Sequence, residues 1–327
     1  MGFISVMNKT LFLFTSFLLL VSCNQKKPNT NTEATNSFST ISVIIDDQLW
    51  NGEVGDSIRN KFASPVLGLQ EEEPMFTLNQ FPVKLLEGFM TNGRNTIVIK
   101  KEAKSKYTIK TNEKNPSQTI VTISGRVVQE IIDTLEIHAP EIIQTIKSFE
   151  IKEYQKQIKK ANIEANAIKQ KFDVEVKIPL KYKIVEKAKN FIWLKKEITS
   201  GSLSVLIYQT PLNQLKDTIN ITQSIIKTRD SIGKKYIHGR KLKTRMITEK
   251  SFSPYLSKKS IAQKTAYEIK GTWDLKNDFM SGPFINYAII DKNRKRVLFL
   301  EGFCYAPSKE KRDLMFELEA IIKTVNF

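Results

Sequence analysis

The chain has 327 residues, of which 41% are hydrophobic and 26% charged, and its formal net charge is +17. Thirteen glycines and eleven prolines are too few for a collagen-like or low-complexity chain, and two cysteines are too few for a disulfide scaffold. The composition is that of a globular protein with enough apolar residues for one large core or two smaller ones.

One apolar run stands near the N-terminus. Residues 11–21 read LFLFTSFLLLV and follow Lys9. A helix that spans a bilayer needs roughly 20 apolar residues, whereas a run of this length is typical of the apolar segment of a signal peptide. We therefore predict that residues 1–22 are a signal peptide.

The run ends in Leu20-Val21-Ser22-Cys23, which resembles the lipobox of bacterial lipoproteins. The resemblance implies that the Cys23 thiolate takes up a diacylglycerol, that the chain is cleaved before it, and that the new N-terminus is acylated, with palmitate among the acyl chains. Two or more acyl chains hold a protein durably on a membrane. The alternative is an ordinary secretory signal followed by an incidental cysteine.

Residues 23–40 are predicted to be the lipidated cysteine and a flexible tether. The stretch 24–40, NQKKPNTNTEATNSFST, is polar and has a single aromatic residue, so it cannot bury an apolar core. An address in the cell envelope argues against nucleic acid as a partner, in spite of the positive charge. The scattered lysines either form a solvated surface or attract anionic groups of the envelope, namely lipid headgroups or phosphorylated glycans.

The region 41–137 is predicted to be an N-terminal α+β unit. Val54, Ile58 and Phe62 recur every four residues, as in an amphipathic helix. Pro65 and Pro74 bracket a loop that contains three consecutive glutamates. The expected elements are strands at 41–46, 96–101, 106–111 and 118–124, and helices at 56–63, at 82–92 and after Gly125.

Residues 138–172 are predicted to be a long connecting helix. From Ile151 to Phe172, apolar residues recur at alternating spacings of three and four, with polar residues between them. This narrow stripe packs on the protein's own sheet or on the preceding helix, or part of it stands free as a partner-binding or dimerising helix. A third arrangement is a helix broken near Glu150, where the stripe changes phase.

The region 173–327 is predicted to be a second α+β unit. A hairpin is expected around Ser200-Gly201, and Ser308 is expected to cap the last helix. Because the strands follow one another in threes and fours, antiparallel sheets are favoured over a doubly wound parallel sheet. The fold class is therefore α+β, with two mostly antiparallel sheet regions and flanking helices, joined by a long amphipathic helix. The expected elements are strands at 174–178, 191–197, 203–209, 245–249, 266–273, 284–291 and 296–305, and helices at 218–235 and after Pro307.

Five segments together carry a family resemblance: VIIDDQLWNGEVGDSIRNKF (43–62), NFIWLKKEI (190–198), RDSIGKKYIHGR (229–240), GTWDLKNDFMSGPFINYAIID (271–291) and EGFCYAPSKEKRDLMFELEAIIKTV (301–325). They resemble a domain-of-unknown-function family of lipoproteins from Bacteroidota. The resemblance implies a lipid-anchored envelope protein and no particular reaction. Residues 24–27 lack the acidic stretch of surface-exported lipoproteins, which favours the periplasmic side of the outer membrane. The element order of the C-terminal half loosely resembles the Mog1/PsbP-like fold.

The sequence offers few candidates for catalysis or metal binding. His138 and His238 stand alone, and no HExxH, CxxC, P-loop, GxGxxG or GxSxG motif occurs. We therefore predict no catalytic residue, no metal site and no cofactor. In the stretch 271–287, aromatic residues alternate with short amides and acids, which suits a sugar or peptide, although a hairpin with core aromatics is the alternative. The candidate binding surface consists of Trp273, Asn277, Asp278, Asn286 and His238.

These observations predict a non-enzymatic binding or assembly factor, anchored by lipid in the cell envelope. Its predicted partners are the membrane and an envelope protein or glycan. The competing hypothesis is an envelope hydrolase or transferase whose site is assembled from distant residues, around Asp46, His238 and Cys304. Convergence of those three side chains would favour the enzyme, whereas exposed aromatic residues in 271–287 or on the long helix would favour binding.

Overall fold

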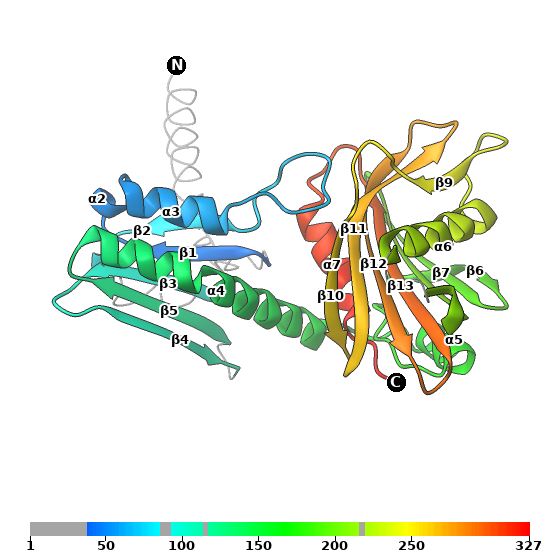
Figure 1. Cartoon of the computed structure of the whole chain (residues 1–327), viewed down its shortest axis with the longest axis horizontal. Helices are drawn as coiled ribbons and strands as arrows, with labels where there is room; N and C mark the ends of the chain where they lie inside the picture. Colours follow the sequence, from blue (N-terminus) through cyan, green and yellow to red (C-terminus); the bar gives the residue numbers. More distant parts are fainter. Residues whose placement is uncertain (1–37, 86–92, 114–116, 216–219) are drawn as a thin grey trace, which may run out of the picture. The chain divides into compact units, whose positions relative to one another are not determined.

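The computed structural model describes residues 38–85, 93–113, 117–215 and 220–327. These residues form two β-sheets, of five and eight strands, and six α-helices (Figure 1). The α+β class is therefore confirmed. Cys23, the predicted signal peptide and most of the predicted tether lie outside the described residues. Within the described ranges, no helix combines the length and the apolar character needed to span a membrane.

The first sheet has the strand order β2-β1-β3-β5-β4 and is mostly parallel. β1 pairs in parallel with β2 and β3, and β3 pairs in parallel with β5, so only β4 and β5 are antiparallel. The prediction of a mostly antiparallel sheet is wrong here. Two helices, α2 (Asp47–Trp50) and α3 (Glu53–Phe62), carry the chain from β1 towards β2, and parallel neighbours require such a crossover. The strands are β1 (Thr40–Ile44), β2 (Thr77–Phe81), β3 (Asn95–Lys101), β4 (Lys106–Asn112) and β5 (Gln118–Gly125).

Helices α3 and α4 (Val128–Gln157) cover one face of this sheet (Figure 1). The helix predicted over 56–63 and the helix after Gly125 are thereby confirmed. Of the helix predicted from Pro82, the described part is a 3₁₀ turn, Val83–Leu85, and residues 86–92 lie outside the described ranges. The side chains of α4 that enter the core are Ile131, Leu135, Ala139, Ile142 and Ile146.

The predicted single helix over 138–172 is wrong, because two helices occupy this stretch. α4 begins ten residues earlier and ends at Gln157, and α5 runs over Asn162–Phe172. Between them, the Ala161 amide donates to the Ile178 carbonyl (2.7 Å), so the backbone there pairs with a later segment instead of continuing the helix. The stripe residues Ile168 and Phe172 pack in the core of the second sheet, which agrees with the first of the three arrangements.

The second sheet is antiparallel throughout, with the strand order β10-β11-β12-β13-β8-β7-β6 and β9 beside β11. The predicted hairpin at Ser200-Gly201 is confirmed, since Ile198 pairs with Gly201. The stretch 174–178 forms no strand and makes an isolated bridge from Glu175 to Asn326. The strands are β6 (Lys183–Ala188), β7 (Phe191–Ile198), β8 (Gly201–Pro211), β9 (Arg245–Thr248), β10 (Tyr255–Ile261), β11 (Lys264–Lys276), β12 (Ser281–Asp291) and β13 (Arg296–Tyr305).

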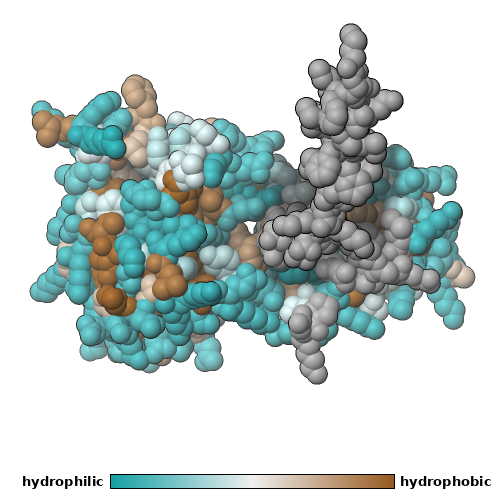
Figure 2. All heavy atoms as spheres, turned by 180° about the vertical axis from the view of Figure 1, so that it is seen from behind, coloured by the Kyte–Doolittle hydropathy of each residue, from teal (hydrophilic) through white to brown (hydrophobic). Residues whose placement is uncertain are grey.

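Helices cover both faces of the second sheet. α5 and α7 (Arg312–Ile322) pack on one face, and α6 (Ile221–Tyr236) packs on the other (Figure 1). From behind, the molecule is mainly hydrophilic, and hydrophobic residues gather on the part formed by the second sheet (Figure 2). Large apolar side chains exposed in this part include Ile163, Leu180, Val185, Leu242, Phe252 and Phe279.

A buried ion pair ties α6 to the sheet. Arg229 is 1% exposed, donates from Nε to Glu301 Oε1 (2.9 Å), and places its guanidinium 3.8 Å from the centre of the Phe284 ring. Asn286 donates from its amide to Glu301 Oε2 (2.8 Å) and to the Tyr208 hydroxyl (3.0 Å). The charge of Glu301 is thus compensated inside the protein, which a buried carboxylate requires.

Candidate ligand-binding pocket

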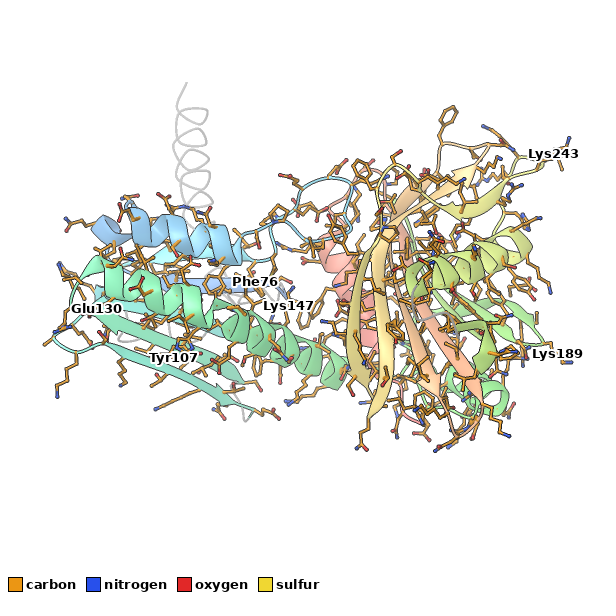
Figure 3. All side chains as sticks on the ribbon, viewed as in Figure 1. Phe76, Tyr107, Glu130, Lys147, Lys189 and Lys243 are labelled. Atoms are coloured by element: carbon orange, nitrogen blue, oxygen red, sulfur yellow. The ribbon has the colours of Figure 1, made fainter. Side chains whose placement is uncertain are left out.

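A narrow pocket lies where the segment 64–76, α4, α7 and strands β11 and β12 meet. Its cavity volume is about 80 Å³. Since a water molecule needs roughly 10–15 Å³ of such space, the pocket has room for about five to eight waters or for one small molecule of similar size. Two of its residues, Phe76 and Lys147, are labelled in Figure 3. The apolar lining consists of Val66, Leu67, Leu69, Met75, Phe76, Ile151, Pro283, Phe284, Ile285, Met315 and Phe316.

Glu73 fixes one wall of the pocket. Its buried carboxylate accepts hydrogen bonds from the backbone amides of Lys311 and Arg312, both at 2.7 Å. These amides stand at the start of α7, where helix donors lack partners within the helix and the helix dipole favours a negative charge. The N-cap residue is Lys311, so the expectation that Ser308 caps this helix is wrong. A carboxylate from a remote loop does so instead.

Further contacts hold the segment 64–76 against α7. The Lys311 amine is 2.9 Å from Glu71 Oε2, and the Arg312 guanidinium donates to the Pro74 carbonyl (3.0 Å). Within the segment, Pro65 and Pro74 form an isolated bridge, as expected for a loop closed at both ends. The segment is therefore a closed loop seated on one helix end.

A cluster of charges lies at one side of the pocket. The Lys270 amine is 3.6 Å from Glu319 and 3.8 Å from Glu268, and the Tyr287 hydroxyl is hydrogen-bonded to Glu268. Burial opposes ionisation of Glu319, but the charges of Lys270 and Lys323 outweigh it and lower the pKa of Glu319 to about 2. Glu319 is thus ionised at neutral pH and is paired with Lys270 and Lys323.

Two further polar side chains in the pocket have unused bonding capacity. Glu150 is 1% exposed, and its Oε1 accepts from Arg94 Nε (3.2 Å) and from the Asn95 amide. Its Oε2 has no hydrogen-bond partner in the described part of the chain. Burial raises the pKa of Glu150, against the opposing charge of Arg94. The acid therefore holds its proton to a higher pH than an exposed glutamate would.

Lys147 stands three residues before Glu150 on α4, which places both side chains on one side of the helix. Among the described residues, no hydrogen bond or ion pair engages its amine. Although the residue is exposed, protein packed around the amine and the nearby charge of Lys270 lower the pKa of Lys147. The carboxylates of Glu319 and Glu268 attract the amine from a distance, but no acid in the described part of the chain forms an ion pair with it, so it can take an anion as a direct partner.

The pocket therefore combines apolar walls with a cation and a carboxyl group that retain bonding capacity. A small molecule with an anionic head and an apolar tail matches this arrangement. Lys147 attracts the head, the unpartnered Oε2 of Glu150 lies beside it as a further polar group, and side chains such as Phe76 and Met315 surround the tail. No group of three or more metal-ligating side chains occurs in the described ranges.

Two family models match the chain. The domain of unknown function DUF4837 matches residues 160–324, which is half of the chain. The chain belongs to the DUF4837 family. A second domain of unknown function, DUF8532, matches residues 34–159. The two matches meet at residue 159, inside the break between α4 and α5.

The other comparisons add little to the DUF4837 assignment. No curated protein matches the chain. Among solved structures, the Ran-binding protein Mog1p of Saccharomyces cerevisiae is similar at 9% identity, over 47% of this chain and 89% of that chain, with a TM-score of 0.33. The expected likeness to the Mog1/PsbP-like fold is thus present only as a weak resemblance.

Of the five residues predicted as a binding surface, two lie inside the protein. Trp273 is 2% exposed and donates from Nε1 to the Cys304 carbonyl (3.2 Å), and Asn286 is 0% exposed. They face the core of the sheet, so they cannot line a surface, and the alternative of a hairpin with a core aromatic holds for Trp273. The other three, Asn277, Asp278 and His238, lie in two adjoining loops away from the pocket.

The residues named for the competing enzyme hypothesis do not form one site. Asp46 follows β1 in the first sheet. Cys304 is buried in the core below α7, whereas His238 follows α6 on the opposite face of the second sheet. Burial raises the pKa of the Cys304 thiol to about 12, so this cysteine is a poor nucleophile.

The pocket residues escaped the sequence analysis, although one signal was present. Glu150 stands four residues after Ile146, in phase with the apolar side of α4. The change of phase near Glu150 was interpreted as a possible break in the helix. It marks instead a carboxyl group buried on the core side of a continuous helix.

Proposed function

We propose that this protein is a lipid-anchored, non-enzymatic binding protein of the cell envelope whose pocket accepts a small amphiphile with an anionic head. The observation that carries the proposal is that one largely apolar pocket is lined by Lys147, whose amine has no hydrogen bond or ion pair among the described residues, and by Glu150, whose Oε2 has no hydrogen-bond partner there either. Burying an anionic group costs free energy unless such partners compensate it, and here they are already in place.

The proposed anchor rests on the N-terminal sequence. An apolar run of signal-peptide length ends in the lipobox-like Leu20-Val21-Ser22-Cys23, and a polar stretch follows. This order supports a body held near a bilayer by a tether, and the lack of an acidic stretch at residues 24–27 favours the periplasmic side of the outer membrane. Many lipids and acylated molecules of the cell envelope are anionic amphiphiles, so the envelope is a suitable source of the ligand.

Octanoate is a suitable probe because it has a carboxylate and a short apolar chain. We expect octanoate to raise the thermal unfolding temperature of the full chain and to bind in calorimetry, because only the folded state offers the pocket. Octanol and octyltrimethylammonium, which have the same chain without the anion, should bind more weakly.

The variant Lys147→Met tests the role of the amine. It should weaken octanoate binding by about 10- to 150-fold, since a charge-assisted hydrogen bond contributes roughly 1.5–3 kcal/mol. The matched control is Lys152→Met on the same helix, because the amine of Lys152 is exposed and pairs with Glu113 at 2.9 Å. Equal losses in the two variants, or binding of octanol as tight as that of octanoate, would contradict the proposal.

The anchor has its own test. Cells that express the full chain are fed an alkyne-tagged fatty acid, and label is expected on the wild-type protein and not on Cys23→Ala. The variant should also leave the membrane fraction. Wild-type protein without label would refute the anchor and would leave the pocket proposal to its own experiment.

A further inference from the structure

Two exposed apolar side chains stand at one end of the second sheet and do not belong to the pocket lining. Leu242 is 92% exposed and Phe279 is 95% exposed. They belong to the loops 238–244 and 276–280, which together we call the basic tip. The Asn277 amide donates to the Lys243 carbonyl (3.1 Å), and the Lys241 amine lies 3.4 Å from Asp278 Oδ1. The two apolar residues are therefore presented by loops that are joined to each other.

The first of these loops is held in a defined conformation. The Gly239 amide donates to Thr244 Oγ1 (2.8 Å), and this hydroxyl donates to the Lys241 carbonyl (2.9 Å). Lys243 has a φ of 63°, in the left-handed region. A loop with this many internal bonds presents Leu242 to solvent without a large loss of conformational entropy on binding.

Cationic side chains surround the apolar pair. Arg240, Lys241, Lys243 and Lys276 are exposed within the tip. A neighbouring groove, about 380 Å³ in volume, is lined by five cations and a single carboxylate. Arg245 and Lys276 of this groove are paired across β9 and β11, so the groove is continuous with the tip. The groove residues are Lys227, Asp230, Ser231, Lys234, Arg245, Ile247, Lys250 and Lys276.

The single carboxylate in the groove is already engaged. Asp230 Oδ1 accepts from the Thr248 amide (2.8 Å) and from the Thr248 hydroxyl (2.7 Å). It also lies 3.7 Å from the buried guanidinium of Arg229. Within the described ranges, none of the five groove cations forms an ion pair, so their charge is available to an anion such as a phosphate.

We propose that the basic tip is a second membrane contact, which inserts Leu242 and Phe279 between the headgroups of an anionic phospholipid bilayer while the surrounding lysines and arginines bind lipid phosphates. Large apolar side chains at a loop end gain free energy in the interface, and basic residues gain it from the negative surface potential. The inference does not depend on the proposed ligand of the pocket or on Cys23, since none of these residues belongs to either.

Tryptophan fluorescence tests insertion directly. The full chain with Phe279→Trp is mixed with vesicles of brominated phosphatidylcholine, with and without phosphatidylglycerol. Ile163→Trp is the matched control, because Ile163 is 80% exposed and lies on α5. The N-terminal apolar run and the three native tryptophans are present in both proteins, so their contributions cancel.

We expect bromine to quench the emission of Trp at position 279 on the anionic vesicles, and the emission at position 163 to stay unchanged. Each basic residue near an anionic surface strengthens binding about fivefold. Adding Arg240→Gln and Lys243→Gln should therefore weaken the quenching titration about 25-fold. Absent quenching at 279, equal quenching at both positions, or equal quenching on vesicles without phosphatidylglycerol would overturn the membrane contact.

Discussion

Glu73 offers the sharpest test of how the pocket is built. It is the last of three consecutive glutamates, and of these only Glu73 is buried, with its carboxylate on two amides at the start of α7. Glu73→Ala removes a helix cap and leaves two buried amide donors unpaired. A lost cap costs about 1 kcal/mol, and a buried group left without its partner costs roughly 1–3 kcal/mol. We expect the free energy of unfolding to fall by about 2–4 kcal/mol.

The matched control is the neighbouring residue. Glu72 is exposed, and Glu72→Ala should change the free energy of unfolding by no more than about 0.5 kcal/mol. Glu73→Gln keeps one acceptor oxygen and loses the charge, so its loss should lie between those of the two alanine variants.

Urea unfolding of the three variants measures these differences, and hydrogen exchange locates them. In Glu73→Ala, the amides of Lys311 and Arg312 and the segment 64–76 should exchange faster than in the wild type. Equal losses for Glu72→Ala and Glu73→Ala, or unchanged exchange over 64–76, would refute the reasoning that one remote carboxylate seats this wall of the pocket.

Three further predictions follow from buried groups. Arg229→Ala should lower the free energy of unfolding, measured by urea titration, by about 3–5 kcal/mol, because Glu301 is left as an uncompensated buried acid. A smaller loss in the double variant Arg229→Ala/Glu301→Leu would show that the two residues are energetically coupled. The pKa of Glu319 is lowered to about 2, so below its ordinary pKa of about 4.5 the unfolded chain binds a proton more readily than the folded chain. About 3 kcal/mol of the free energy of unfolding should therefore be lost as the pH falls from 4.5 through 2. In Glu319→Gln, stability should depend less on pH over this range. Cys304 is buried with a pKa raised to about 12, so a thiol reagent should modify it only in denaturant, and rapid labelling of the native protein would contradict its placement.

Local patterns in the sequence predicted many of the elements of this fold. The recurrence of Val54, Ile58 and Phe62 gave the helix α3, and the turn at Ser200-Gly201 gave the hairpin of β7 and β8. Both depend on neighbours close in sequence, so a periodic pattern is enough to identify them.

Features set by distant contacts were not predictable. β2, with the sequence TLNQF, has no strong alternation, and its parallel pairing with β1 is decided by the crossover through α3. The break after α4 depends on a backbone bond from Ala161 to Ile178. A local sequence pattern does not show which distant strand or segment will form the hydrogen bonds of a given backbone group.

In the candidate site, too, features set by distant contacts could not be predicted from local sequence patterns. Aromatic residues among short amides suggested a surface around Trp273, yet β11 turns that side chain into the core. Three glutamates in a row look alike in the sequence, and only the fold brings Glu73 to the start of α7. Lys147 acquires its unusual environment from the protein packed around its amine and from Lys270, more than a hundred residues away.

The most direct measurement of the central claim is a crystal structure of the full chain with 8-bromooctanoate, in which anomalous scattering locates the bromine. The account predicts a bromine peak within the pocket, beside Phe76 and Met315, with the carboxylate of the ligand on Lys147 and Glu150. A pocket that stays empty of bromine while the probe is in excess, or a peak at another place on the molecule, would contradict it.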